Sequence, residues 1–382
     1  MDEPENQETS SPVRRRWHRT RVVGTIFLVV AVPIVWAGQL IHIDYYTEAP
    51  GEAVPVQPMV TIDGATEYEA EGSFMLLYIR KRERISLLRY AQAWLDPDID
   101  VKKGDYSKPG NSPAVIDAGS TSDMEQAGIA ARKLALELLG YEVTPVAGVV
   151  VTGVIEGRPA AGVLTVGDVL LEADGKALDS ARTLVSIIHS HDVGDELEIK
   201  LDRDGETETV TLKMQSSGDP NPVPIIGVFT DVRYEFPVDI KFEGRIEAIG
   251  GPSAGLSMTL ALLDELTEGE LTGGIDVAVT GTIDILGNVG NVGRVDLKAK
   301  AAANAGATLM LVPKCREAGT IDDYESPETY ELVRDFKKSC DAEVRRARQV
   351  IDTVVEVATL DEALNALAAH GGDPLPEQVS PQ

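Results

Sequence analysis

The segment Gly250-Gly-Pro-Ser-Ala-Gly-Leu-Ser-Met-Thr-Leu-Ala-Leu-Leu-Asp-Glu-Leu266 places two glycines and a proline directly before a long apolar run. The glycines permit a sharp turn, and the run predicts a helix over Ser253–Leu266. A serine at a helix start lies beside backbone N–H groups that have no helical acceptor. Those donors and the helix dipole suit the oxyanion of acyl transfer. Ser253 is therefore a candidate nucleophile, with Gly251 and Pro252 as the turn and oxyanion region.

Taken alone, the same residues fit an N-capping serine after a glycine turn, so a catalytic role needs a base. Residues 251–255 satisfy the G-x-S-x-G pattern of α/β-hydrolases, which requires a histidine farther along the chain. The only histidine after Ser253 is His370, beside the polar C-terminal tail. No strong apolar strand directly precedes Gly250 either. A Ser-His-Asp triad is therefore rejected.

A lysine can act as the base if burial lowers its pKa toward neutrality. Lys298 lies in a predicted helix over Leu297–Ala305, after the glycine-rich loop Asn288–Asp296. The residues one turn away from it are apolar, so its face of the helix is predicted to be buried. Lys300 points elsewhere and is expected to be solvated.

Five segments occur in one order along the C-terminal third of the chain: Gly251-Pro-Ser-Ala-Gly255, Val279-Thr-Gly-Thr-Ile283, Gly293-Arg-Val-Asp-Leu-Lys-Ala-Lys300, Ala305-Gly-Ala307 and Leu311-Val-Pro-Lys314. Together they resemble the proteolytic domain of the Lon protease family. The resemblance implies that Ser253 is the nucleophile, that Lys298 is the general base and that Thr280 holds the lysine amine. It departs from the family pattern at Arg294, in place of a glycine, and at Asp296, in place of a lysine. Asp296 could change the charge near the site, although neither departure removes a catalytic group.

A second pattern lies upstream, in Ala147-Gly-Val-Val-Val151, Glu156-Gly-Arg-Pro-Ala-Ala161, Val166-Gly-Asp-Val-Leu-Leu171 and Asp174-Gly175. It resembles a PDZ domain of the bacterial protease type, expected over 147–215. Such a domain adds a peptide as a strand and captures its C-terminal carboxylate with backbone N–H groups. The resemblance places this peptide site on Gly148, Val149, Val150 and Val151.

The N-terminus carries a cluster of arginines between Arg14 and Arg21, directly before an apolar run over 22–43. The run is long enough to cross a bilayer, and the arginines favour a cytoplasmic start. A cleaved signal peptide is the alternative, but the run is longer than a usual signal core and no small-x-small cleavage site follows promptly. A single-pass anchor at the cell membrane is therefore expected, with the catalytic and PDZ domains outside the cytoplasm.

A formal net charge of −27 disfavours nucleic acid as a partner, because so acidic a surface repels phosphates. No P-loop pattern occurs, so the ATPase of true Lon proteases is absent and no cofactor is expected. His189-Ser-His191 lacks further ligands, and no metal site is expected. Whether Cys315 and Cys340 pair is left open by the sequence.

The predicted fold is α+β: a transmembrane helix, a sandwich-like PDZ domain and a Lon-type α+β domain. The expected boundaries are a basic cytoplasmic tail (1–21), the membrane helix (22–43), an extracytoplasmic α+β segment (44–146), the PDZ domain (147–215), the Lon-like domain (222–370) and a disordered tail (371–382). Within the 44–146 segment, the residues Lys102–Asp123 are expected to form a loop and Met124–Leu139 a helix.

This arrangement resembles the Lon-like PDZ proteases of Gram-positive bacteria, especially actinobacteria. It implies an ATP-independent serine endopeptidase that acts on polypeptides or their C-termini. A homo-oligomer is compatible with the sequence. The alternative is a non-catalytic PDZ adaptor whose Lon-like domain has lost activity. Only the endopeptidase requires Ser253 and Lys298 together.

Overall fold

The computed structural model describes residues 36–104, 113–218, 222–243, 251–317, 319 and 327–376. The chain divides into two compact units, one of residues 1–49 and 80–104 and one of residues 50–79 and 105–382. The predicted basic tail, most of the predicted membrane helix and the last six residues lie outside the described ranges. Within those ranges no helix is both long and apolar enough to span a bilayer.

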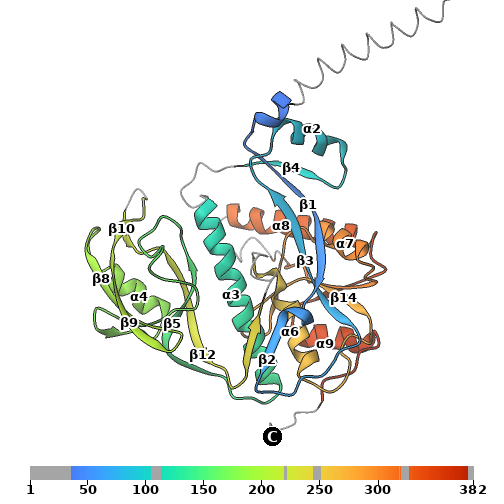
Figure 1. Ribbon diagram of the computed structural model, residues 1–382. Coiled ribbons are helices and arrows are strands. Elements are labelled where there is room, and N and C mark those ends of the chain that lie inside the picture. The colour runs from blue at the N-terminus through green and yellow to red at the C-terminus, as the bar shows by residue number, and fades with distance from the viewer. Residues whose placement is uncertain are drawn as a thin grey trace, which may run out of the picture. The chain divides into compact units, whose positions relative to one another are not determined.

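The first unit contains a helical turn over 36–40, the start of strand β1, helix α2 and strand β4 (Figure 1). Helix α2 spans Leu87–Leu95, and the hydroxyl of Ser86 caps it by accepting from the N–H of Arg89. The start of β1 pairs with β4 in an antiparallel ladder. The bounds of these strands are Tyr45–Pro55 for β1 and Asp100–Lys103 for β4.

Parallel strands form the centre of the second unit, in the order β18-β17-β14-β3. Successive residues of a strand point to opposite faces of a sheet, so the side chains of these strands pack into two hydrophobic cores, one on each face. Phe74 and Leu76 belong to one hydrophobic core, and Met75 and Leu77 to the other. The bounds of the strands are β3 Ser73–Arg82, β14 Asp276–Val279, β17 Leu309–Pro313 and β18 Thr353–Val357.

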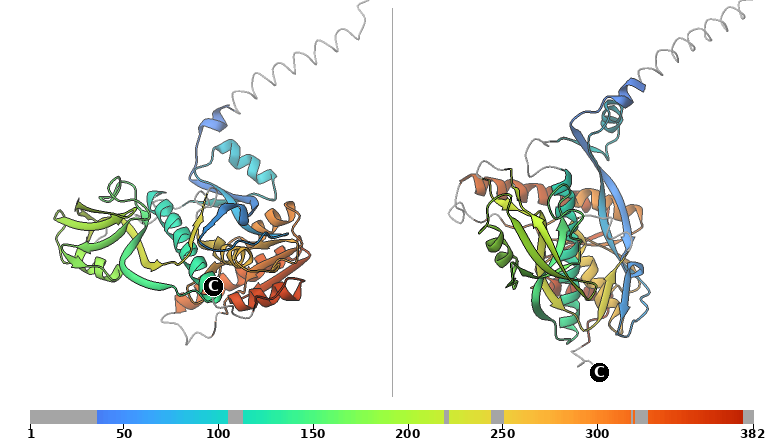
Figure 2. Two further views of the ribbon diagram at one scale, coloured as in Figure 1. Left: turned by 60° about the horizontal axis from the view of Figure 1, so that its bottom comes forward. Right: turned by 60° about the vertical axis from the view of Figure 1, so that its left-hand side comes forward.

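Helices cover both faces of this sheet (Figures 1 and 2). Residues of α3, α6 and α9 fill the core on one face, and residues of α7 and α8 fill the core on the other. The sheet is therefore the middle layer of three. The helix bounds are α3 Pro113–Leu138, α6 Gly255–Glu265, α7 Val295–Asn304, α8 Pro327–Ala347 and α9 Leu360–Ala369.

A second sheet, with the order β12-β5-β6-β8-β9, carries its own core together with α4. Strands β8 and β9 form an antiparallel hairpin around Asp204-Gly205. The bounds are β5 Thr144–Val154, β6 Val169–Ala173, β7 Lys176–Ala177, α4 Ala181–Ile188, β8 Glu196–Arg203, β9 Glu206–Lys213 and β12 Val228–Glu235. Three short pairs complete the strands: β10 (Gln215–Ser216) with β11 (Pro224–Ile225), β2 (Val60–Asp63) with β13 (Asp239–Phe242), and β15 (Thr282–Ile283) with β16 (Val289–Gly290).

The mixed α+β prediction is confirmed, but several elements differ from the sequence-based prediction. The expected loop over 102–123 is wrong at Lys102 and Lys103, which belong to β4, and again from Pro113 onward, where α3 already begins. The segment 44–146 is also not a unit of its own. Its strand β3 pairs with β14, and its helix α3 packs on α6. Helix α8 and strand β18 were not predicted at all.

A disulfide joins Cys315, just after β17, to Cys340 of α8. Both cysteines are buried in the same core as α7. The bond closes a loop of 25 residues and so reduces the conformational freedom of the unfolded chain.

We expect the double replacement of Cys315 and Cys340 by alanine to lower the free energy of unfolding by about 3 kcal/mol, because the unfolded chain regains that freedom. Chemical denaturation of the oxidised chain and the variant measures the difference. An unchanged midpoint would show that the crosslink does not stabilise the fold. Reduction of the unaltered chain provides a control that leaves the sequence intact.

Candidate active site

Ser253 lies in a 3-10 turn, η3, which spans Pro252–Ala254 and leads directly into α6. The turn is held by the chain that follows β14. The N–H of Gly281 donates to the carbonyl of Ser253 at 3.0 Å, and the N–H of Leu256 donates to the carbonyl of Gly281 at 3.1 Å. These two bonds fix both ends of the turn, while the Ser253 side chain stays half-buried.

The predicted oxyanion role of Gly251 and Pro252 needs correction. Gly251 has φ +95°, which suits a glycine turn, but its N–H donates to the carbonyl of Ser120 at 3.1 Å. Pro252 has no N–H to donate. These two residues therefore shape the turn. The backbone N–H groups of Ser253 and Ala254, at the start of the helical segment, are the better placed donors.

Lys298 is 4% exposed on α7, so the expected burial of its face is confirmed. Its Nζ donates to the Thr280 hydroxyl at 2.9 Å, the contact expected for Thr280. Burial lowers the pKa of the Lys298 amine to about 7, and the carboxylate of Glu343 opposes this shift. An appreciable fraction of the amine is therefore neutral near pH 7. Lys300, by contrast, is half-exposed.

Thr280 connects the lysine to the serine segment. It is fully buried directly after β14, and its hydroxyl also contacts the carbonyl of Ser253 at 3.4 Å. Between the described atoms of Lys298 and Ser253 themselves, no direct hydrogen bond is present. Catalytic hydrogen bonds are often formed only once substrate is bound, so this geometry is compatible with a lysine base.

The two departures from the family pattern form an ion-pair cluster beside Lys298. Asp296 is buried, and its carboxylate pairs with Arg346 at 2.9 Å and with Arg294 at 3.4 Å. The two arginines compensate the negative charge that Asp296 brings close to Lys298. Arg294 has φ +61°, a left-handed conformation that glycine adopts without strain. This conformation explains why a glycine is typical at the position.

Glu343 of α8 was not identified from the sequence. It is 8% exposed, and its Oε2 accepts the N–H of Val295 at 2.9 Å, at the first residue of α7. It therefore caps the helix that carries Lys298. Burial raises the pKa of the Glu343 carboxyl. Sequence spacing gave no signal for this contact, because Glu343 lies 48 residues from Val295.

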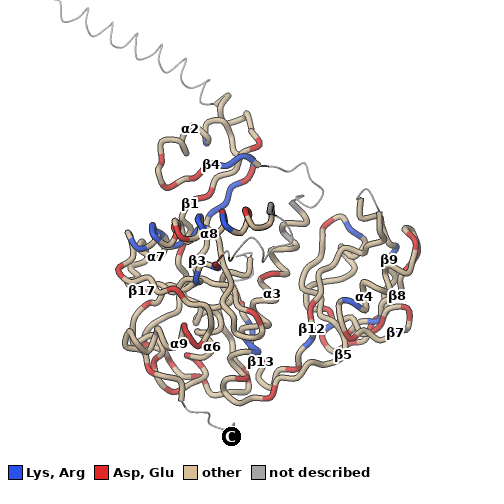
Figure 3. Tube along the Cα trace, turned by 180° about the vertical axis from the view of Figure 1, so that it is seen from behind, with Lys and Arg blue, Asp and Glu red and all other residues tan. Residues whose placement is uncertain are grey.

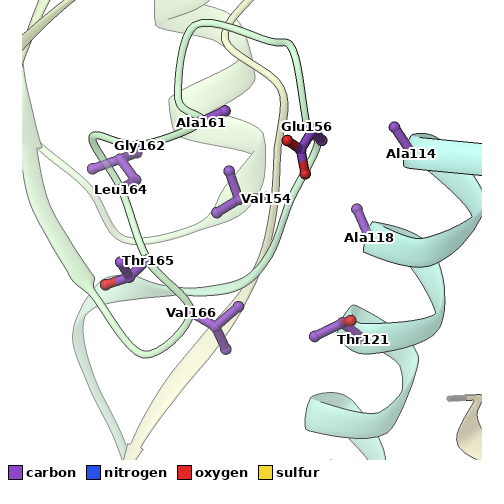
Figure 4. Close-up of a pocket in the computed structure, with 10 residues that line it drawn as sticks. All are labelled: Ala114, Ala118, Thr121, Val154, Glu156, Ala161, Gly162, Leu164, Thr165 and Val166. Carbon is purple, nitrogen blue, oxygen red and sulfur yellow. The ribbon is translucent and has the colours of Figure 1, made fainter. Parts of the chain in front are cut away.

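Helix α3 contacts both the turn that holds Ser253 and the β5-containing sheet. The carbonyl of its Ser120 holds Gly251, and the Ser122 hydroxyl is 2.8 Å from that of Thr152 on β5. A cavity of about 580 Å³ lies between α3 and the segment 154–166 (Figure 4). Its lining includes none of the catalytic candidates. The cavity is therefore separate from the candidate site of Ser253, Thr280 and Lys298.

The predicted peptide-binding residues Gly148, Val149, Val150 and Val151 lie on β5. This strand pairs with β12 on one side and with β6 on the other. Both of its edges are occupied over these residues, so a peptide cannot add to β5 as a further strand. Val149 and Val151 are instead fully buried in the core. The ends of this sheet are β12 and β9.

Comparisons with known proteins match two parts of the chain. Residues 122–214 match the PDZ domain, and residues 238–333 match the Lon protease (S16) C-terminal proteolytic domain. The second match contains Ser253, Thr280 and Lys298.

Among relatives, the Lon protease of Clostridioides difficile is 43% identical over 22% of this chain and 10% of its own length. The archaeal Lon protease of Pyrococcus abyssi is 32% identical over 34% of this chain and 11% of its own length. The chain thus spans about a tenth of these relatives. Among solved structures, the PDZ domain of the SdrC-like protein of Listeria innocua is 36% identical over 22% of this chain and 92% of that one, with a TM-score of 0.21.

Proposed function

We propose that the chain is a membrane-anchored, ATP-independent serine endopeptidase with Ser253 as nucleophile and Lys298 as general base. The observation that carries the proposal is the buried amine of Lys298, bonded to Thr280 beside the turn that holds Ser253. A buried lysine without a carboxylate in direct hydrogen-bond contact costs stability, and such a cost is typical of a functional group.

In the proposed reaction, neutral Lys298 takes the proton of the Ser253 hydroxyl as its oxygen attacks the peptide carbonyl. The N–H groups of Ser253 and Ala254 receive the resulting oxyanion. The Lys298 ammonium then protonates the leaving amine, which gives an acyl-enzyme and restores the neutral lysine. Water, deprotonated by the same lysine, releases the acyl group.

A fluorophosphonate probe tests the nucleophile. We expect it to label the unaltered chain at Ser253 and to leave Ser253→Ala unlabelled, because the turn of Ser253 contacts Thr280, the partner of the Lys298 amine. Ser257→Ala is the matched control, since Ser257 lies one turn along and donates to the carbonyl of Ala254. Labelling that persists in Ser253→Ala would assign the nucleophile to another serine, whereas no labelling of the unaltered chain would favour the alternative function, a PDZ adaptor without catalysis.

The proposed peptide site lies along the edge of β12, beside α4, instead of on β5. Within the described residues, no strand pairs with the outer edge of β12. Helix α4 contacts β12 and presents Val185, which is 47% exposed. Gly227, with φ +85°, directly precedes the strand. A peptide C-terminus would extend the sheet here, with its apolar side chain against α4.

We expect Val185→Asp to weaken the binding of a C-terminal peptide by about tenfold. The aspartate carboxylate would repel the peptide carboxylate, and the apolar contact of the valine side chain would be lost. Val193→Asp is the control: Val193 is also 47% exposed but lies beyond α4. Calorimetry with free and amidated peptides measures the effect. Equal affinity for free and amidated peptides would contradict carboxylate capture.

The anchor and the extracytoplasmic location remain part of the proposal. They are supported by the apolar run over 22–43 and by the arginines before it. The described end of this run carries Trp36, Leu40 and Ile41, all more than half exposed. External protease added to wall-stripped cells should digest the catalytic domain. Protection until the membrane is lysed would place that domain in the cytoplasm.

A further inference from the structure

We infer that the outer face of helix α2 lies in the membrane interface, where it supports the chain through Trp94 and Leu95. The inference rests on the proposed anchor and extends it. It assigns a lipid-binding surface to a helix that the proteolytic mechanism does not use. The surface consists of Leu87, Tyr90, Ala91, Trp94 and Leu95.

These residues recur at the spacing of one helical face, and all are exposed. Trp94 is 82% exposed and Leu95 is 77% exposed. The apolar stripe of a helix in a globular protein normally faces the core. On α2 it faces outward, while the small Ala93 points inward. The helix is therefore amphipathic, and its apolar face needs a partner.

The predicted membrane run is attached directly to this helix. The N–H of Leu87 donates to the carbonyl of Ile41 at 2.8 Å, and the N–H of Ile43 donates to the carbonyl of Ile85 at 3.0 Å. His42 and Ser86 form an antiparallel bridge between the two segments. Since Ile41 and Ile43 end the apolar run, α2 begins where that run leaves the bilayer. A nine-residue helix extends only about 14 Å, so all of α2 stays close to that level.

The charge of this unit fits a lipid headgroup layer. Its described residues hold seven lysines and arginines against six carboxylates, whereas the whole chain has 35 against 62. Basic residues gather near β4 (Figure 3): Lys102-Lys103 lie on β4 itself, and Arg80-Lys81-Arg82 form the end of β3. Such groups attract anionic headgroups near the surface. Tryptophan and tyrosine also favour the interface. A second copy of this chain would explain the exposed face but not the attached apolar run.

The chain has three tryptophans, so lipid contact can be measured one residue at a time. The full chain is reconstituted into anionic vesicles as Trp17→Phe/Trp36→Phe, which leaves Trp94 as the only tryptophan. We expect lipids brominated near the headgroup to quench Trp94 at least twofold more strongly than lipids brominated deep in the acyl chain. Acrylamide in the water should quench it little. Leu87→Ser/Leu95→Ser in this background should reduce the lipid quenching.

The companion variant Trp17→Phe/Trp94→Phe leaves only Trp36 and reports on the anchor. If Trp36 is quenched by brominated lipid and Trp94 is not, the anchor stands and the role of α2 is excluded. If neither is quenched, the anchor itself is excluded. If Trp94 is protected from both acrylamide and brominated lipid, a protein surface covers it and the inference also fails.

Discussion

Replacing Lys298 with methionine is expected to reduce peptidase activity by at least about 10³-fold while making the chain more stable near neutral pH. The activity falls because methionine cannot accept the Ser253 proton. The stability rises because an apolar side chain of similar shape replaces a buried amine. The pKa of Lys298 is about 7 in the folded chain, whereas the pKa of a free lysine is about 10.4. Peptide hydrolysis and thermal unfolding measure the two effects.

The direction of the pH dependence follows from these values. Activity of the unaltered chain should rise with pH through about 7, as Lys298 loses its proton. Between pH 7 and 10 the unfolded chain binds a proton that the folded chain lacks. The contribution of Lys298 to the free energy of unfolding therefore rises with pH across that window and does not change with pH below it. Lys298→Met should remove both dependences. Lys300→Met is the matched control, and an equal loss of activity there would contradict the assignment.

The candidate catalytic site could be predicted because its parts are carried by short segments with a fixed order. Ser253 begins a helix, Thr280 ends a strand and Lys298 lies one turn into a helix, and the resemblance connected them. The structure brings Lys298 to Thr280 and Thr280 to the Ser253 turn. The burial of Lys298 followed from its apolar helix neighbours. In these cases local sequence decided the local conformation.

Other elements depend on distant partners and had no comparable local signal. The start of α3 is rich in glycine, serine and aspartate, which are weak helix formers, yet it is helical. Its contacts with the catalytic turn, α6 and β5 stabilise it there. The pairing of β3 with β14 joins residues about 200 positions apart. Helix α8 is highly charged, so its apolar periodicity was hard to detect.

The peptide site was assigned to the wrong strand for a related reason. Val149–Val151 form an apolar stretch after a glycine, which is what a peptide-binding strand would also present. The strand order excludes them, because β12 occupies their outer edge. That strand begins at Val228, beyond the predicted end of the domain at 215. A prediction confined to the contiguous domain could not include a strand supplied from outside it.

Replacing Glu343 with glutamine is expected to shift the pH–activity curve to lower pH by about one unit. The Glu343 carboxylate favours the protonated form of Lys298, so its loss lowers the pKa of the amine further. The amide oxygen of glutamine can still accept the N–H of Val295, so the cap of α7 and the maximal rate should be retained. Rate measurements across pH 5–9 give the midpoint and the plateau separately.

The charged neighbours of this site define the controls. Asp296 of α7 pairs with Arg294, the residue before that helix, and with Arg346 of α8, and both Arg294 and Asp296 also act on Glu343. All three side chains are kept in the glutamine variant. Glu343→Ala also removes the cap, so it should lower the plateau as well as shift the midpoint. Asp341→Asn removes the same charge from α8 at a carboxylate paired with Lys337, and it should leave the midpoint in place. If Glu343→Gln leaves the midpoint unmoved, the pKa of Lys298 is set by burial alone, and Glu343 acts only as a helix cap.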